Sequence, residues 1–247
     1  MQTLTYKNGL TDGLPIGIGY LSVSFGFGVM AKSMGFSVIE SVIIAGTNLA
    51  SAGQVAGITI ITACGTLFEI ILAMLVINLR YSLMALTLTQ KLDKSFTTPM
   101  RVFCSTFITD EIFAVSSAKP HINTKYFLGL ATLPYLGWTG GTLLGAAAGS
   151  IMPKSLAAAM GIAIYGMFIA IFVPPAKKFT GALIAVLVAS ILSCIIKYVP
   201  FLSFISDGFS IIICAVVAAG VAAKLKPIFE NVPENDTSGE MTAEAKQ

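Results

Sequence analysis

The sequence predicts an all-α membrane protein, a polytopic helical bundle of about seven or eight membrane segments. Its 247 residues are 55% hydrophobic and only 11% charged, with a mean hydropathy of +0.86, whereas a soluble domain carries about 25% charged residues. Several runs contain no charged residue and approach or exceed the roughly 20 residues that a helix needs to cross hydrocarbon. These runs are 13–31, 41–68, 126–153, 155–176 and 179–196. They lack the alternating pattern of a transmembrane barrel.

The segments are expected in chain order between a polar start (1–12) and a polar tail (224–247), with the transmembrane transporter domain at 13–223. We place them near 13–31, 38–50, 55–77, 102–118, 126–149, 156–174, 179–199 and 201–223. The tail lacks an apolar pattern, which predicts disorder.

Two stretches of the chain depart from ordinary spans. The short segment 38–50 runs into Ser51-Ala52-Gly53-Gln54, where small and polar residues interrupt the apolar pattern. Farther on, Asn78 is a candidate cap for a new helix that has Arg80 in its first turn. Interrupted segments of this kind are typical of discontinuous helices at transporter binding sites. A plain turn between two helices is the alternative in each case.

The glycine-rich spans suggest close helix packing and contain a faint internal similarity. A shift of 119 residues aligns Leu14-Pro15 with Leu133-Pro134, and Gly26 with Gly145. An internal repeat, as in many transporters, explains this match, and so does chance in a chain rich in these residues. Glycines also let helices approach closely where lipid provides no hydrophobic drive.

Composition and missing motifs exclude several functional classes. The net charge of +3 is modest, and no basic face for nucleic acid is apparent. One histidine and four widely separated cysteines do not make a metal site, so no cofactor is expected. The sequence lacks the signatures of zinc proteases, of serine hydrolases and of the phosphate loop of ATP-driven proteins. We therefore do not expect an enzyme.

Two polar clusters lie inside the apolar body: Asn78-Leu79-Arg80-Tyr81 and Thr109-Asp110-Glu111. A charge near the bilayer centre costs about 2.5–3.5 kcal/mol, so such residues usually have a function. Arg80 has the planar, multi-donor geometry that suits a carboxylate, and a helix starting at Asn78 adds free N–H groups. The alternative is an anchor of Arg80 and Tyr81 at headgroup level.

Three acidic residues are candidates for proton coupling: Asp110, Glu111 and Glu69. Asp110 and Glu111 are adjacent, so on a helix they point about 100° apart. One is expected to pair with Arg80 or a substrate ammonium while the other titrates; the alternative is that both cap a helix start after Thr109, near the membrane surface. For Glu69, a structural role with a tertiary partner is the alternative to coupling.

Polar and small residues near the first interruption complete the candidate site. Gln54 and Asn48 are candidates either to hydrogen-bond a ligand or to hold helices together. Gly53 is expected to shape the break through which substrate enters.

In their order along the chain, four motifs resemble AzlC-type proteins, the large subunits of bacterial branched-chain amino acid exporters. The motifs are Gly13-Leu14-Pro15, Ala52-Gly53-Gln54, Asn78-Leu79-Arg80-Tyr81 and Thr109-Asp110-Glu111-Ile112-Phe113, and the resemblance spans roughly residues 10–225. It implies export of leucine, isoleucine, valine and methionine by a multi-pass protein of the bacterial plasma membrane. A small AzlD-type membrane protein is the implied partner. Tyr81 stands where the family often has histidine, which weakens a titrating role beside Arg80.

These observations predict a secondary transporter that lies in the lipid bilayer and exports small apolar amino acids across it. Substrate-binding candidates are Asn78, Arg80, Gln54, Gly53 and Asn48, and proton-coupling candidates are Asp110, Glu111 and Glu69. A channel-like pathway and a non-transporting scaffold subunit remain as alternatives.

Overall fold

The computed structural model describes residues 4–149, 151–153, 155, 166, 169, 172–174, 176–202 and 204–226. Within them the chain forms helices and no strand, apart from one isolated bridge between Leu92 and Ile122. The predicted all-α membrane bundle is thereby confirmed. The segment expected at 156–174 lies almost wholly outside the described residues, as does the tail from residue 227.

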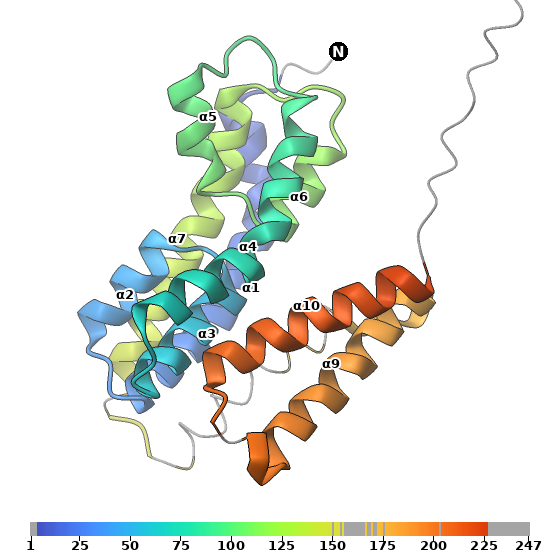
Figure 1. Cartoon of the computed structure of the whole chain (residues 1–247). Helices are drawn as coiled ribbons and strands as arrows, with labels where there is room; N and C mark the ends of the chain where they lie inside the picture. Colours follow the sequence, from blue (N-terminus) through green and yellow to red (C-terminus); the bar gives the residue numbers. More distant parts are fainter. Residues whose placement is uncertain are drawn as a thin grey trace, which may run out of the picture.

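The described helices form a long bundle with a helix pair at its side (Figure 1). They are α1 (Tyr6–Ser33), α2 (Val38–Thr47), α3 (Ser51–Thr62), α4 (Leu67–Thr89), α5 (Thr98–Ser105), α6 (Asp110–Ser117), α7 (Thr124–Gly149), α9 (Thr180–Tyr198) and α10 (Asp207–Leu225), with a short 3₁₀ turn at Pro200–Leu202. Four of them are long and apolar enough to cross a membrane, namely α1, α4, α9 and residues 208–225 of α10.

The α1 and α7 helices are the two longest described helices of the bundle and run parallel, side by side (Figure 1). Gly9 lies against the α7 backbone at Leu130, and Gly28 lies against it at Ala146. A Cβ atom on Gly28 would fall 2.6 Å from the Ala146 backbone nitrogen, so only glycine permits this approach. These are the two helices that the shift of 119 residues aligns, and the expected packing role of their glycines is confirmed.

Two pairs of short helices enter the bundle from opposite ends (Figure 1). The α2–α3 pair lies beside the end of α1, and the α5–α6 pair lies beside the start of α7. Each pair is broken by a few non-helical residues, 48–50 in the first and 106–109 in the second. The expected single span 102–118 is therefore wrong. Gly53 and Gln54 belong to the first turn of α3, after the break rather than within it.

The α4 helix corrects two expectations. It runs unbroken from Leu67 to Thr89, so Asn78 lies inside it and caps no helix. Thr66 is the actual cap, and the expected span 55–77 is interrupted at residues 63–66, where Cys64 has a φ of 55°. The apolar residues on both sides of Asn78 favour a continuous helix, because in lipid the backbone N–H and C=O groups must be satisfied within the helix, which outweighs the weak preference of one asparagine for a helix start.

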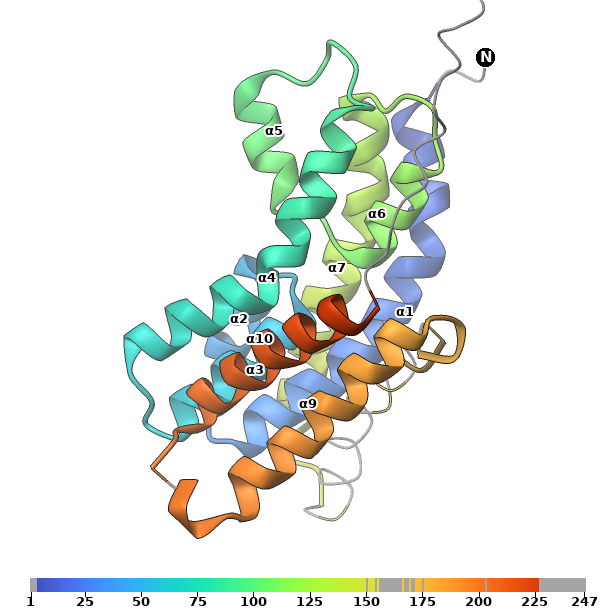
Figure 2. The ribbon, with the colours of Figure 1, turned by 45° about the vertical axis from the view of Figure 1, so that its right-hand side comes forward.

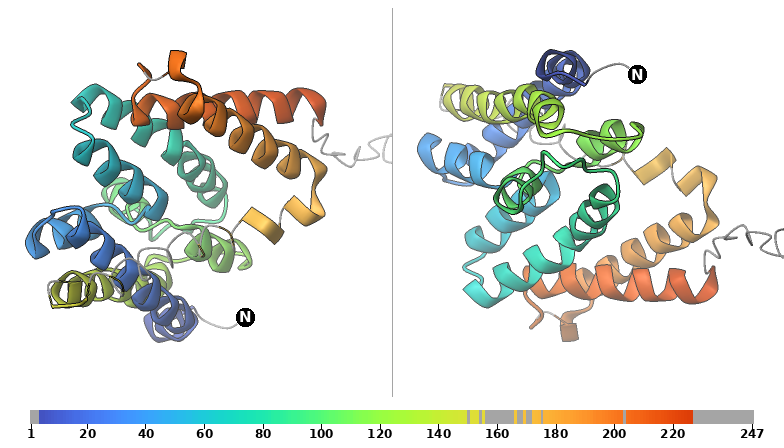
Figure 3. Two further views of the ribbon diagram at one scale, coloured as in Figure 1. Left: turned by 90° about the horizontal axis from the view of Figure 1, so that it is seen from below. Right: turned by 90° about the horizontal axis from the view of Figure 1, so that it is seen from above.

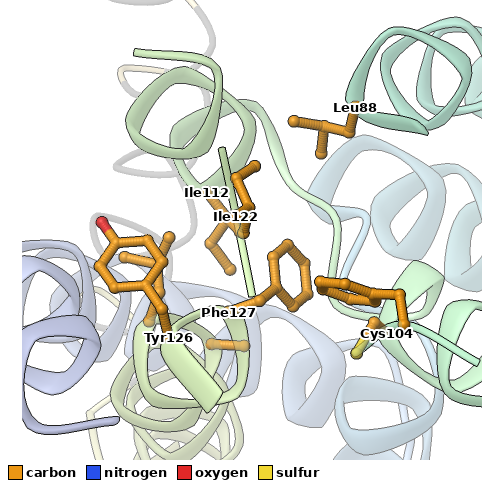
Figure 4. Packing of buried hydrophobic residues seen from close by; sticks show 9 residues of the cluster. Leu88, Cys104, Ile112, Ile122, Tyr126 and Phe127 are labelled. Atoms are coloured by element: carbon orange, nitrogen blue, oxygen red, sulfur yellow. The ribbon is translucent and has the colours of Figure 1, made fainter. Parts of the chain in front are cut away.

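Two hydrophobic cores lie at the two ends of the bundle. One joins α4, α5, α6 and α7, and Figure 4 shows it from close by; its buried residues are Leu88, Phe96, Cys104, Ile112, Ile122, Tyr126, Phe127, Leu130 and Ala131. The other joins the end of α1 to α2, α3 and α7; its buried residues are Phe27, Met30, Ala31, Ala45, Leu49, Ile58 and Trp138. Of the polar residues predicted to be functional, Asp110 and Glu111 line a cavity between these cores.

The α9–α10 pair lies on the far side of α4 from α1 and α7 (Figures 2 and 3). Its α10 helix packs on α9, α4 and α3. Large apolar side chains remain exposed on α4 at a spacing of three or four residues, which places them on one helix face. They are Leu67, Ile71, Leu75, Leu79, Leu83 and Leu86. Such a face is suited to lipid contact.

Candidate functional site

A cavity between the two cores collects residues from five helices and from the two breaks. Its lining residues are Tyr20, Leu49, Ser51, Tyr81, Thr109, Asp110, Glu111 and Trp138. Tyr20 lies about midway along α1, and Trp138 lies about midway along α7. The cavity therefore lies halfway along the bundle, at the depth where transporters bind their substrates. Its volume of about 20 Å³ holds a water molecule but no amino acid.

The start of α3 meets this cavity without a cap. Ala50 occupies the N-cap position, its side chain accepts no hydrogen bond, and the first turn contains no acidic residue. The N–H groups of a helix start carry a partial positive charge, which an anion can satisfy. Ser51 and the backbone around it therefore form the electropositive end of the cavity.

Gln54 fixes the position of this helix start. It is 1% exposed, its Oε1 accepts a hydrogen bond from Trp138 Nε1 at 3.1 Å, and its amide nitrogen donates to the Asn48 carbonyl oxygen. Asn48 Oδ1 in turn accepts from the Ala50 nitrogen at 3.1 Å. The side chains of Gln54 and Asn48 thus hold the break together and tie it to α7.

The start of α6 meets the same cavity with a cap and two acids. Thr109 Oγ1 accepts from the Ile112 nitrogen at 3.4 Å. Asp110 Oδ2 lies 2.9 Å from Arg80 Nη2, and the hydroxyl of Tyr20 donates to Glu111. The neighbouring carboxylates thus point to different helices, α4 and α1, as the helical geometry predicts. The cap is thus Thr109 rather than either acid, the expected pairing with Arg80 is made by Asp110, and a titrating role for the other acid stays a prediction.

Arg80 lies inside α4 and contacts the cavity residues Asp110 and Tyr81, but it does not itself line the cavity. Its side chain is 40% exposed, and that of Asp110 is 32% exposed. Its Nη2 also donates to Tyr81 Oη at 3.0 Å, with the guanidinium carbon 4.8 Å from the centre of the Tyr81 ring. Arg80 is nine residues from the end of α4, or about 13 Å along the axis.

Sequence reasoning missed two aromatic residues of the site, Tyr20 and Trp138. Their rings form an edge-to-face contact with centroids 5.3 Å apart and an interplanar angle of 75°. Trp138 is the single tryptophan of the chain. No local signal sets Tyr20 apart, because both spans also contain other aromatic residues such as Phe27 and Tyr135.

Of the eight predicted residues, only Asp110 and Glu111 line the cavity. Glu69, Asn78 and Gly53 make their contacts elsewhere. Glu69 begins α4 and forms a capping box with Thr66, whose backbone N–H donates to Glu69 at 2.7 Å; the Ser206 hydroxyl also donates to Glu69. Asn78 lies inside α4, and its Oδ1 is buried without a hydrogen-bond partner among the described residues. A Cβ on Gly53 would lie 3.3 Å from the Met74 sulfur, so Gly53 permits close packing of α3 on α4.

The far end of α6 is tied to the long helices. The ammonium of Lys91 donates to the Ser117 carbonyl oxygen, and Lys119 pairs with Asp12 at 3.2 Å. Asp12 also accepts a hydrogen bond of 2.6 Å from the hydroxyl of Tyr126 on α7. Both ends of α6 are therefore held by polar contacts. Among the described residues no group of His, Cys, Asp and Glu is suited to hold a metal ion.

Broken helices that meet at a charged cavity halfway along a membrane bundle are the arrangement of a membrane transporter. Residues 15–152 match the family model described as AzlC protein, and this range contains every residue that lines the cavity. The chain therefore belongs to the AzlC family. Members of this family are membrane proteins generally linked to amino-acid transport.

Relatives of the chain are named as membrane proteins. An uncharacterized membrane protein of Archaeoglobus fulgidus is 34% identical over 71% of this chain and 78% of its own length. The inner membrane protein YgaZ of Escherichia coli is 28% identical over 66% of this chain and 70% of its own. An uncharacterized membrane protein of Helicobacter pylori is 25% identical over 71% of this chain and 78% of its own length. No solved structure matches the chain.

Proposed function

We propose that the chain is a secondary transporter that exports branched-chain amino acids, and methionine, across the bacterial plasma membrane. Proton coupling and a small AzlD-type membrane partner complete the proposal. The observation that carries it is the cavity in which the uncapped start of α3 and the acidic start of α6 meet. Such a cavity has one end suited to a carboxylate and another suited to an ammonium.

An amino acid zwitterion fits this charge distribution. Arg80 and the start of α3 would bind the α-carboxylate, and Asp110 or Glu111 would bind the ammonium. Arg80 and Asp110 are paired in this conformation, and the cavity is too small for an amino acid. Binding therefore requires this ion pair to open, and the zwitterion then supplies each partner with a replacement charge.

The other predicted site residues receive supporting roles. Gln54, Asn48 and Gly53 position the start of α3, because their contacts are with protein groups. Glu69 is assigned to the start of α4 rather than to coupling, which leaves Asp110 and Glu111 as the carboxyls that carry the proton. Asn78 keeps a proposed role through its buried oxygen, which has no hydrogen-bond partner among the described residues.

The test is efflux of radiolabelled leucine from preloaded proteoliposomes, with and without an imposed pH gradient. The full chain is examined alone and together with a co-purified small membrane partner. We expect gradient-dependent efflux that competes with isoleucine and valine. A channel-like pathway would instead give efflux that is insensitive to protonophores, with no exchange of internal for external substrate. No efflux in either preparation would refute the proposal and favour a scaffold subunit.

A further inference from the structure

One side of the cavity carries no charge and is formed by Leu49, Trp138 and the ring of Tyr20. Leu49 is 8% exposed and Trp138 is 2% exposed, and both belong to the core at the end of α1. The charged groups Asp110 and Glu111 come from the α6 side of the same cavity. A zwitterion held between the start of α3 and the acids of α6 would have its side chain directed to this remaining, apolar wall.

The two aromatic side chains of this wall are fixed in orientation. The indole N–H of Trp138 is held by Gln54, the hydroxyl of Tyr20 is held by Glu111, and the two rings contact each other edge to face. Leu49 differs from them because it belongs to the extended break between α2 and α3 and has no polar anchor in its side chain. Among the apolar lining residues, Leu49 is therefore the one whose side-chain size sets the space available to a substrate.

We infer that Leu49, Trp138 and Tyr20 form the side-chain subsite of the transported amino acid, and that Leu49 sets the size of side chain accepted. This inference rests on the proposed transport function and names the groups that select among apolar substrates. One methylene in a hydrophobic pocket changes selectivity by about 10- to 200-fold. Shortening Leu49 should therefore shift the preference toward bulkier side chains.

The single tryptophan supplies a readout of binding that is independent of transport. Purified full chain is titrated with leucine, valine, alanine and phenylalanine while tryptophan fluorescence is followed. Because Trp138 lines the cavity, the wild type should show a saturable change with leucine and a much weaker affinity for phenylalanine. In Leu49→Ala the ratio of phenylalanine to leucine affinity should rise at least tenfold, with a smaller rise in Leu49→Val.

The matched control is Leu130→Ala, which removes the same atoms from a fully buried leucine in the other core. It should keep the wild-type affinity ratio. Leu49→Val also serves if Leu49→Ala fails to fold. An unchanged ratio in the folded Leu49 variants, with leucine binding intact, would overturn the inference.

The outcomes also separate this inference from the proposed function. Leucine binding with the expected change of ratio, but no leucine efflux from proteoliposomes, would refute transport and keep the subsite. Leucine efflux in the wild type with no tryptophan response to any of the four amino acids would keep transport and refute the subsite.

Discussion

The starts of α3 and α6 line one cavity, but they differ in cap, charge and support. The start of α3 has no side-chain cap and no acid in its first turn, and Gln54 holds it in place. The start of α6 is capped by Thr109 and carries Asp110 and Glu111, which are paired with Arg80 and Tyr20. Two helix starts would otherwise give a cavity that is positive on both sides.

This difference shows how two helix starts can be suited to the two oppositely charged ends of a zwitterion. The acids reverse the charge of the α6 start, while the α3 start keeps its free N–H groups. Substitutions at the two helix starts can remove this difference one feature at a time, beginning with the acids.

The largest effect is expected for Asp110→Asn. Arg80 then loses its charged partner, and the substrate ammonium loses a carboxylate. A hydrogen bond to a charged group contributes about 1.5–3 kcal/mol, so leucine efflux should fall about 10- to 100-fold. Glu40→Gln, which alters a capping box at the start of α2, is the control and should transport normally. Normal efflux in Asp110→Asn would contradict the assigned role of this carboxyl.

Arg80→Lys tests the carboxylate end. Lysine keeps the charge but lacks the planar fork of donors that matches a carboxylate. We expect about a tenfold loss of affinity that is the same for leucine, isoleucine and valine, measured by competition in the efflux assay. Full activity in Arg80→Ala would show that the carboxylate is bound elsewhere.

Ala50→Asp makes the two helix starts alike. The new carboxylate would cap α3 and repel a substrate carboxylate, and one charge at a helix start is worth about 0.3–1 kcal/mol. Leucine affinity should therefore fall about two- to fivefold in the tryptophan fluorescence titration. Ala50→Asn, which caps without charge, separates the two causes: it should retain most of the affinity, and an equal loss would point to packing.

Gln54→Leu removes the support of the α3 start. The indole N–H of Trp138 would then be buried without a partner, which lowers the free energy of unfolding by about 1–3 kcal/mol. Thermal unfolding of the purified protein measures the loss. Gln90→Leu, at an exposed position at the end of α4, is the matched control. Equal stability of the Gln54 and Gln90 variants would argue against the positioning role.

The smallest effect on transport is expected for Glu69→Gln. Glutamine can still form a capping box with Thr66, so the melting temperature should fall less than in Gln54→Leu. The dependence of leucine efflux on the pH gradient should match that of the wild type, because Glu69 lies outside the cavity. A lost gradient dependence would return Glu69 to the coupling carboxyls.

The sequence by itself determined the all-α membrane bundle, because composition and the length of uncharged runs leave a bilayer-spanning chain few other structures. It also identified Arg80 and Asp110, since charges inside apolar runs are rare enough to indicate function. A pair between Arg80 and one of the two neighbouring acids was among the expectations from the sequence, and the structure shows it with Asp110.

The tertiary structure alone decided which polar residues share the cavity. Local pattern left open whether Asn78 starts a helix or lies inside one, whereas Thr66 and Glu69 have the spacing of a capping box, which local pattern can identify. Local pattern could not select Tyr20 and Trp138, which look like ordinary span residues until α1, α3 and α7 bring them beside Glu111 and Gln54. Contacts between helices far apart in the sequence depend on close packing along the α1 and α7 glycines, and that packing is a property of the assembled bundle.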